Sequence, residues 1–585
     1  MKHRKRILAL MLAMAVMLSL LTACGASTPA VSSTVSDVAA SSASAGETVE
    51  AEATEAEAPV AADAPEASDA EEMGEEPPEA EEEIEYTVTY PITDEPLTLS
   101  IFWTFHNFLS MFNVTADVIE EIPTFKMAEE VTGVSLDFRL VGEENFAENL
   151  QLLWASGDYC DFITNAEREY ASGVDASVED GVLLDLVPYL REHAPDYNRI
   201  LKEHPDFKTE LTSSEGYIVS FAEYCEYSDS GPVIRMDWVR QLGLEAPKTM
   251  DDVTAVARAF RDDLGVRNPV MWNSDLDAFF GWNAFGVSAP GVSDLAWQID
   301  EDGKTVVASM TLDGYKDCLT WMHDAFAEGL CTDDFMSVMN IAYDQYVYSN
   351  QTGLIYSNSN SLASGGAERT GQPDYDLRAI PDLMQKAGSP NKLAKTSGGV
   401  GASALAVSAQ TEYPVECVEY MNWLYTEDGI LVSNYGIEGD AFEYDENGKP
   451  QYTDIIMNAE GMPPFVATFL HTSLVGTPYY NTTERKIASF STEAEKECID
   501  VWATGRTGES IYQGKMNMTE SAEYNQIAGD IITASAEQAL RFITGDRSLD
   551  EYDAFLADME AMGLGRLVEL KQEAYNRYLE SLEEA

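Results

Sequence analysis

The chain has 585 residues, with 102 Asp or Glu against 35 Lys or Arg, so its formal net charge at pH 7 is −67. Such a charge repels nucleic acid, which excludes that class of partner, and it also disfavours an anionic ligand. A hydrophobic content of 45% is typical of a globular protein. The folded part is too long for one ordinary core, so we expect at least two domains.

The first 23 residues have the three parts of an export signal. A basic start (Lys2 to Arg6) precedes an apolar stretch, Ile7–Leu21, that is too short to span a membrane comfortably. It ends in Thr22-Ala23-Cys24, which resembles a bacterial lipobox. That resemblance implies that the thiol of Cys24 carries diacylglycerol and that Cys24 becomes the mature N-terminus. The alternative is a secretory signal with a chance cysteine.

Residues 24–95 are predicted to be a disordered linker. Gly25–Gly46 is rich in Ser, Ala and Thr, whereas Glu47–Glu85 is mostly Ala, Glu and Pro, with about 17 acidic residues and no basic one. Large hydrophobic residues are almost absent, so burial cannot offset the entropy cost of ordering. Like charges extend such a chain, which suits a tether between membrane and folded body. A low-complexity segment without a spacing role is the alternative.

From Leu97 onward, strand and helix patterns alternate. The run Leu97–Trp103 predicts a strand, Ile119–Thr132 a helix, Val134–Leu140 a strand, Asn145–Ala155 a helix and Asp161–Thr164 a short strand. This alternation predicts a parallel sheet with crossover helices. Further strands are predicted at 217–221, 352–356 and 398–407, and further helices at 249–261 (with Thr249 as N-cap), 315–328, 412–424, 533–542 and 549–582.

The cysteines and histidines give no sign of a metal centre or cofactor, and we expect neither. Neither C-x-x-C nor H-E-x-x-H occurs. We interpret most of the six later cysteines as buried free thiols, while disulfides remain open for an exported protein. They are Cys160, Cys225, Cys318, Cys331, Cys417 and Cys498.

Several segments, in order along the chain, resemble extracellular solute-binding protein family 1, and within it the large lipoprotein branch of Gram-positive bacteria. Leu153–Ile163 is similar to that family's LASGDYPDI segment, with Cys160 where proline is usual. Val233–Thr249 is similar to IRKDWLDKLGLEVPKT and is the most specific match. Weaker similarities lie at 399–408, 420–429, 435–440, 445–450 and 542–545.

The resemblance implies an α/β fold of the type II periplasmic-binding-protein kind, in which two lobes joined by hinge strands close on a ligand. We expect a signal peptide at 1–23, the linker at 24–95, lobe 1 at 96–222 plus 393–440, lobe 2 at 223–392 plus 441–545, and C-terminal helices at 546–585. It also implies a lipid-anchored monomer on the extracellular face of the cell membrane, which captures an oligosaccharide and passes it to ABC permease subunits.

The chain departs from the family pattern in one respect that concerns metal binding. Many relatives carry an acidic, Gly-containing loop that resembles a calcium loop. The corresponding segment here, Arg261–Pro269, lacks alternating oxygen ligands over about twelve residues. We therefore expect no calcium there.

A sugar cleft needs exposed aromatic rings with polar neighbours, and in open α/β sheets these lie beyond the carboxyl ends of strands. Single aromatic residues belong more often to a core, and Arg235 and Asp237 are expected to brace the hinge. By strand-end or loop placement, the candidate ligand-binding residues are Trp103, Asn107, Asp158, Tyr224, Tyr227, Trp282, Tyr356, Asn358 and Glu438.

Other functions remain open at this point. A lipid-anchored glycoside hydrolase is one alternative, because carboxylates are abundant enough for two to lie near any cleft. Against an enzyme, no G-x-S-x-G, Walker A or dinucleotide-binding G-x-G-x-x-G is present. A surface adhesin is another alternative, and within the binding class the ligand could be a peptide or another small solute.

Overall fold

The computed structural model describes residues 86–584 except 111, 171, 274, 278, 291–294, 333–334, 337–342, 364 and 385–387. All of the described residues belong to one compact unit, Glu83–Ala585. The expected signal peptide, Cys24 and most of the expected linker lie outside the described residues. In the described part, no helix is both long and apolar enough to cross a membrane.

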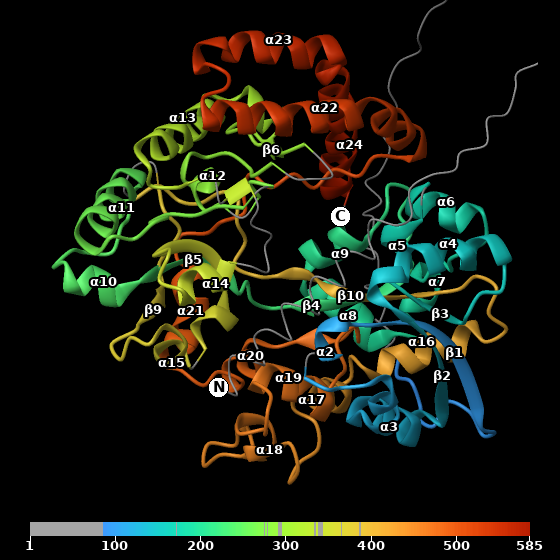
Figure 1. The fold of residues 1–585 in the computed structure, drawn as a ribbon. Helices are drawn as coiled ribbons and strands as arrows, with labels where there is room; N and C mark the ends of the chain where they lie inside the picture. The colour runs from blue at the N-terminus through green and yellow to red at the C-terminus, as the bar shows by residue number, and fades with distance from the viewer. Residues whose placement is uncertain are drawn as a thin grey trace, which may run out of the picture. The chain divides into compact units, whose positions relative to one another are not determined.

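A six-stranded sheet organises the first lobe of the second unit (Figure 1). Its strand order is β13-β4-β10-β3-β1-β2, with bounds Leu97–Phe105 (β1), Val134–Gly142 (β2), Phe162–Thr164 (β3), Ser220–Cys225 (β4), Gly399–Val407 (β10) and Tyr480–Asn481 (β13). Strand β1 pairs in parallel with β2 and β3, which confirms the parallel arrangement predicted for these three strands. Strand β10 runs antiparallel to both β3 and β4.

Helices pack on both faces of this sheet, and the buried cluster includes Leu99, Ile101, Phe162 and Val407. Pro stands in the first turn of five of these helices, where its missing N–H costs nothing. The helices are α2 (Asn107–Ser110), α3 (Pro123–Thr132), α4 (Phe146–Ser156), α5 (Ala166–Glu169), α6 (Gly173–Glu179), α7 (Val187–Leu190), α8 (Pro195–Glu203), α9 (Pro205–Leu211), α16 (Pro414–Trp423) and α17 (Glu427–Tyr435).

The second lobe is built around a three-stranded sheet of order β8-β5-β9, with bounds Ser230–Arg235 (β5), Leu354–Asn358 (β8) and Leu377–Ala379 (β9). A separate hairpin pairs β6 (Trp297–Ile299) with β7 (Val306–Ala308). The helices are α10 (Met236–Gln241), α11 (Met250–Leu264), α12 (Gly281–Ala284), α13 (Asp313–Glu328), α14 (Tyr343–Tyr348), α15 (Gly366–Thr370) and α21 (Glu493–Ala503).

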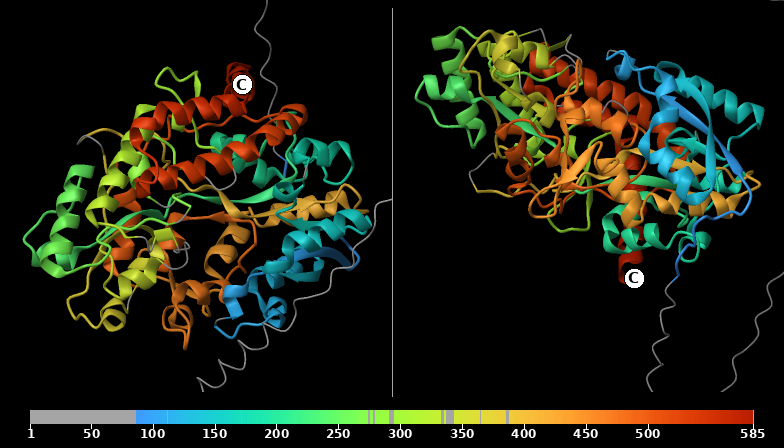
Figure 2. Two further views of the ribbon diagram at one scale, coloured as in Figure 1. Left: turned by 45° about the horizontal axis from the view of Figure 1, so that its top comes forward. Right: turned by 90° about the horizontal axis from the view of Figure 1, so that it is seen from below.

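The C-terminal helices belong to the core of the second lobe. They are α22 (Met518–Thr544), α23 (Tyr552–Met562) and α24 (Leu564–Glu584). Phe542, Phe555 and Leu567 are fully or almost fully buried in the same cluster as Leu319 of α13. Helix α22 packs on α13 and also on α23 and α24, and Figure 2 shows these red C-terminal helices from a second side.

The expected lobe boundary at residue 440 is wrong. Residues 441–481 lie with the first lobe, because β13 pairs with β4 in the six-stranded sheet and Val466 and Leu474 are buried in its core. This segment holds the hairpin β11 (Phe442–Tyr444) with β12 (Pro450–Tyr452), and α18 (Asp454–Met457) and α19 (Pro464–His471). The chain returns to the second lobe only through α20 (Thr483–Ala488) and α21.

Two predictions from the sequence are confirmed, the start of α11 and the state of the cysteines. Thr249 caps α11 as predicted, and its hydroxyl accepts from the backbone N–H of Asp252 while the Asp252 side chain accepts from Thr249 N. The six cysteines of the described part are free thiols, and all except Cys225 are buried. This confirms the interpretation of most of them as buried and unpaired.

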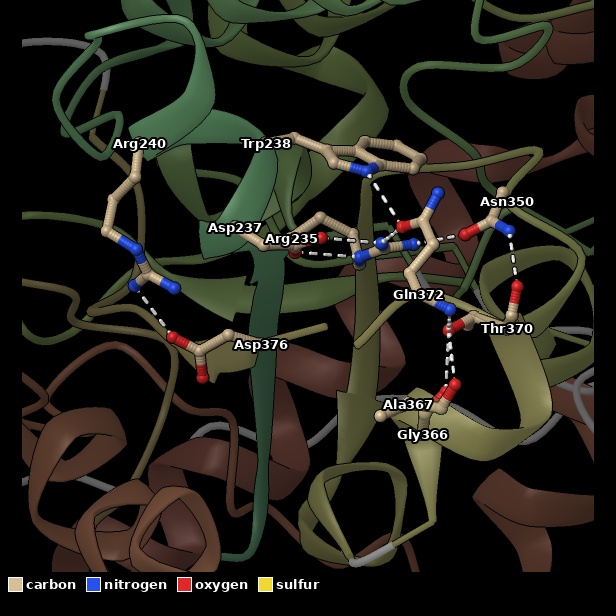
Figure 3. A network of polar contacts seen from close by, with 10 residues as sticks. All are labelled: Arg235, Asp237, Trp238, Arg240, Asn350, Gly366, Ala367, Thr370, Gln372 and Asp376. Carbon is tan, nitrogen blue, oxygen red and sulfur yellow. Dashed lines mark hydrogen bonds and ion pairs between the residues drawn. The ribbon is translucent and has the colours of Figure 1, made fainter. Parts of the chain in front are cut away.

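A buried arginine fastens the end of β5 to its surroundings (Figure 3). The Arg235 side chain is fully buried, and its Nε and Nη2 donate to the two carboxylate oxygens of Asp237 at 2.9 and 2.7 Å. It also donates to Asn350 Oδ1 at 2.8 Å and to Gln372. The guanidinium lies 4.0 Å from the Trp238 ring and 4.6 Å from the Tyr375 ring. Arg235 and Asp237 thus brace the second lobe.

We expect Asp237→Ala to lower the free energy of unfolding by about 3–5 kcal/mol, because it leaves a buried guanidinium without its counter-charge. Urea unfolding followed by tryptophan fluorescence measures the loss. The control is Arg240→Ala, which removes a pair between an exposed arginine and Asp376 and should cost about 1 kcal/mol or less. Equal losses in the two variants would contradict the bracing role.

Candidate ligand-binding site at the hinge

Three chain segments connect the two lobes, and backbone hydrogen bonds join these segments side by side. The segment 224–229 is central: Tyr224 N donates to Tyr479 O and Glu226 N to Asn481 O, at 3.1 and 3.2 Å. On its other side, Gly398 N donates to Cys225 O at 3.0 Å and Ser228 N to Thr396 O at 2.9 Å. The segments around residues 224–229, 396–398 and 479–483 therefore form a three-stranded hinge.

Side-chain hydrogen bonds and an ion pair stabilise the ends of this three-stranded hinge. The Glu226 carboxylate accepts from Tyr480 Oη at 2.6 Å and from Thr483 N at 2.8 Å. Asp229 pairs with Lys486 at 2.9 Å. Burial acts to raise the pKa of Asp229, but Lys486 and the Ser359 hydroxyl outweigh it, so the pKa lies below its usual value.

A groove lies beside this hinge, lined by α9 of the first lobe and α24 of the second; we call it the α9–α24 groove. It consists of two adjoining cavities of about 300 and 400 Å³, which share Thr212, Ser213, Ser214 and Lys515 in their linings. The first is lined also by Glu167, Arg168, Asp175, Glu210 and Ser521, and the second by Lys208, Gln513, Arg577, Tyr578 and Leu582.

The segments that line the groove are packed against the hydrophobic cores of the two lobes. Phe207 and Leu211 of α9 pack in the first lobe, while Met516 and Tyr578 pack against the core of the second. A larger cavity of about 790 Å³ is lined only by residues 86–90, 191–203 and Thr426. A ligand that draws two lobes together must contact both, so the smaller, two-sided groove fits that role better.

The acidic side of the groove is at the carboxyl end of β3, where α5 begins. Glu167 is mostly buried, and its Oε1 lies 3.4 Å from Arg168 Nε, while no described residue donates to its Oε2. Burial raises the pKa of this carboxyl above its usual value, since nothing compensates fully for the lost hydration. Asp175 differs, because it accepts from Ser214 and from Glu215 N.

The cations of the groove are largely engaged within the protein. Arg168 donates to the backbone carbonyls of Gly401 and Ala402 at 2.9 and 3.2 Å. Lys515 Nζ donates to Glu210 O at 3.1 Å, and this bond crosses from the second lobe to the first. Arg577 pairs with Glu520 and donates to Lys515 O.

Tyr578 gives the groove a partly exposed aromatic ring, and its Oη donates to Gln513 at 3.0 Å. The ring of Tyr575 lies 5.6 Å from it, centroid to centroid. An aromatic face beside hydroxyl and amide groups, such as those of Ser213 and Gln513, is a combination that suits a sugar.

A second buried polar cluster lies around β13 and the start of α20. Asn481 donates to Glu223 at 2.9 Å, and burial raises the Glu223 pKa. Arg485 lies close by and donates to Thr468 at 3.3 Å. None of these side chains lines the α9–α24 groove. Because they surround β13 and the start of α20, we assign them to support of the hinge.

None of the nine predicted ligand residues lines the groove. Trp103 and Trp282 were predicted to offer a ring to a sugar, and that prediction is wrong. Both are at most 1% exposed: Trp103 packs edge-on against Phe125 and Phe138, and Trp282 donates to Leu276 O at 2.6 Å. A stacking surface needs an open ring face, which core packing removes.

Tyr224 and Tyr227 are brought together at the hinge, and both are buried. Tyr224 stacks on His204 at 4.2 Å, and Lys486 lies 5.8 Å from the Tyr227 ring. Tyr356 is partly buried on β8, and Asn358 caps the following turn by accepting from Asn360 N.

The other three predicted residues are exposed and separate. Asn107 N donates to Glu143 at 3.1 Å, Asp158 lies 3.8 Å from Arg139, and Glu438 lies in the turn before β11. Their roles as ligand residues, and those of Tyr356 and Asn358, stay predictions.

Sequence reasoning missed Glu167, Arg168, Lys515 and Tyr578. For the first two a signal was available, because they directly follow the predicted strand Asp161–Thr164, at its carboxyl end. The interpretation instead favoured Asp158, which precedes that strand. Tyr578 gives no such signal, since only the packing of α24 brings it to α9. Among the described residues, no group of three or more His, Cys, Asp or Glu side chains could hold a metal ion.

Similarity to known proteins identifies the class of protein to which this chain belongs. A family model described as bacterial extracellular solute-binding protein matches residues 114–430, more than half of the chain. The chain belongs to this family, and its two-lobed α/β fold is that of a solute-binding protein.

Among curated proteins, the chain is similar to the fructooligosaccharide ABC transporter substrate-binding protein FusA of Streptococcus pneumoniae, with 24% identity over 77% of this chain and 86% of FusA. It is also similar to lipoprotein LipO of Bacillus subtilis, with 23% identity over 55% of this chain and 64% of LipO, just under two thirds of that relative. Among solved structures, the alginate-binding protein AlgQ2 without calcium matches with a TM-score of 0.62 and 20% identity, over 83% of this chain and 99% of AlgQ2.

The raised pKa of Glu167 gives a pH-dependent stability. A carboxyl whose folded pKa exceeds its unfolded value contributes fully below the unfolded value of about 4.5, and this contribution is lost as the pH rises through the folded pKa. We therefore expect Glu167→Gln to melt with the wild type at pH 4 and at a higher temperature at pH 7.5. Calorimetry measures both, with the exposed neighbour Glu169→Gln as control. A Glu167→Gln variant that melts lower at pH 7.5 would refute this.

Proposed function

We propose that this chain is the substrate-binding lipoprotein of an ABC importer and that it captures an oligosaccharide in the α9–α24 groove. Carried on a lipid at Cys24, the monomer binds the sugar outside the cell and delivers it to permease subunits. The observation that carries the proposal is a groove beside the hinge that both lobes line. The family membership and the names of FusA and AlgQ2, both sugar binders, support the substrate class.

The mechanism follows from the hinge and the groove. Backbone hydrogen bonds keep the three crossing segments together, so rotation of the lobes is confined to a few residues of each segment. A sugar that contacts α5 and α9 on one side and α24 on the other stabilises one relative position of the lobes over others. The ligand is bound and released unchanged; the protein provides no reaction.

The first test is calorimetric titration of the folded region from residue 86 with oligosaccharides of three to five units and with peptides of similar length. Binding of a sugar at micromolar Kd, with the sugar recovered intact by mass spectrometry, is the expected result. A bound ligand must also raise the melting temperature. A peptide ligand would overturn the substrate class, and cleavage of any sugar would overturn the binding role.

Tyr578→Ala should weaken binding of such a sugar about tenfold, because it removes the stacking surface worth about 1–1.5 kcal/mol. Titration of wild type and variant with one sugar measures the ratio. Tyr444→Ala is the control, because this tyrosine is more exposed than Tyr578 (47% for Tyr444) but lies away from the groove, on the β11–β12 hairpin. Equal weakening by both substitutions would argue against the groove.

For the lipid anchor, Cys24→Ser should release the protein from the membrane into the medium, since serine has no thiol to acylate. Fractionation of cells followed by immunoblotting measures this. A variant still retained in the membrane fraction would mean that another element holds the chain.

A further inference from the structure

The second cavity of the α9–α24 groove, the one of about 400 Å³ that Tyr578 lines, has a charge opposite to that of the chain as a whole. Lys208 of α9, Lys515 and Arg577 of α24 line it, and none of its described lining residues is an Asp or Glu. The whole chain has 102 Asp or Glu against 35 Lys or Arg. The net charge disfavours an anionic ligand over most of the surface, and this cavity is an exception to it.

The acidic side chains near this cavity are already paired, and none of them lines it. Both Nη atoms of Arg577 donate to the Glu520 carboxylate, so the charge of that arginine is compensated. Asp206 lies 4.0 Å from Lys395 Nζ, and the Glu210 carboxylate also accepts from this lysine. Neither acid therefore forms an ion pair with Lys208 or Lys515.

The polar groups of the lining that keep hydrogen-bonding capacity are donors. Lys208 Nζ has no partner among the described residues. Lys515 Nζ makes one bond, to the backbone carbonyl of Glu210 at 3.1 Å, which leaves two of its three N–H groups. Gln513 Oε1 accepts from Tyr578 Oη, so Gln513 offers its NH₂ group to the cavity. A ligand therefore meets positive charge and unfilled donors.

The two lysines belong to different lobes. Lys208 follows Phe207, which is buried in the core of the first lobe, and Lys515 precedes Met516, which packs against the core of the second. Desolvation lowers the pKa of the Lys515 ammonium, because no carboxylate is paired with it to compensate fully. An anion between the two lysines would be attracted by both lobes and would favour one relative position of them.

We propose that the second cavity binds the acidic group of an acidic oligosaccharide, and that Lys208 and Lys515 are the residues that select it. This inference rests on the proposed function and narrows its substrate class. The ammonium groups and the Gln513 amide donate hydrogen bonds to a carboxylate or a sulfate, while the Tyr578 ring packs on the adjoining sugar unit. Hydrogen bonds between charged groups are stronger than those to a neutral hydroxyl, so an acidic sugar gains more than a neutral one of the same shape.

The test needs ligands that differ in charge alone. The mature chain is titrated by calorimetry with oligogalacturonides with and without methyl esters and with galactan oligomers with and without sulfate. Oligoalginates and neutral gluco-, manno-, galacto- and fructo-oligosaccharides complete the panel. We expect the tightest ligand to be acidic and to bind about tenfold more tightly than the same sugar without its charge. That ratio should fall at high salt, since salt screens the attraction. The two pairs show whether the acidic group is a carboxylate or a sulfate.

A set of variants tests the named residues. Lys208→Gln and Lys515→Gln should each reduce the preference for the charged over the uncharged sugar about fivefold, because each removes one ammonium from the cavity. Lys126→Gln is the control, because this exposed lysine of α3 does not line the groove, and it should leave the preference unchanged. The melting temperature of each variant shows whether it is folded.

The outcomes separate this inference from the proposed function. A neutral sugar as the tightest ligand would overturn the inference and leave the oligosaccharide function standing. Absence of binding to every sugar, by a chain that still melts cooperatively, would overturn both. An unchanged preference in both lysine variants would overturn the assignment of the acidic group to this cavity.

Discussion

The three-segment hinge is the constraint on which the rest of the molecule depends. Its central segment, 224–229, is paired on both sides, so backbone hydrogen bonds couple the three crossing segments to one another. The pairing also fixes where the sheet of the first lobe ends and where β5 begins. Glu210 of α9 is placed by two neighbours of this hinge, Lys395 and the Val400 N–H. The hinge therefore sets both the motion of the lobes and the position of one wall of the α9–α24 groove.

Buried charge is used differently in the two lobes. In the second lobe Arg235 is surrounded by partners on every side, so the charge strengthens one fixed arrangement. At the carboxyl end of β3, Glu167 is left short of donors, and its pKa rises as a consequence. A fully satisfied network resists change, and an unsatisfied group lowers stability unless something binds to it. Arg235 therefore braces the second lobe, whereas the Glu167 carboxyl lowers the stability of the first.

Much of the fold could be predicted from the sequence, because the signals involved are local. The alternation of Leu97–Trp103, the glycine after Thr132 and the cap at Thr249 each act over a few residues, and the structure has an element at each. The site could not be predicted to the same extent. Trp103 and Trp282 have the polar neighbours of a binding residue, but contacts from distant segments bury them. The boundary at residue 440 failed because β13 pairs with β4 across a long interval of sequence.

The position of α24 at the end of the chain determines when the groove can be completed. One wall of the groove, α5 and α9, lies early in the chain, and the facing wall lies last, after almost all of the second lobe. A chain that is synthesised from its N-terminus can complete the six-stranded sheet only after β13, and it can add Tyr578 later still. A chain clipped before α24 would therefore keep every strand of that sheet and lack one wall of the groove.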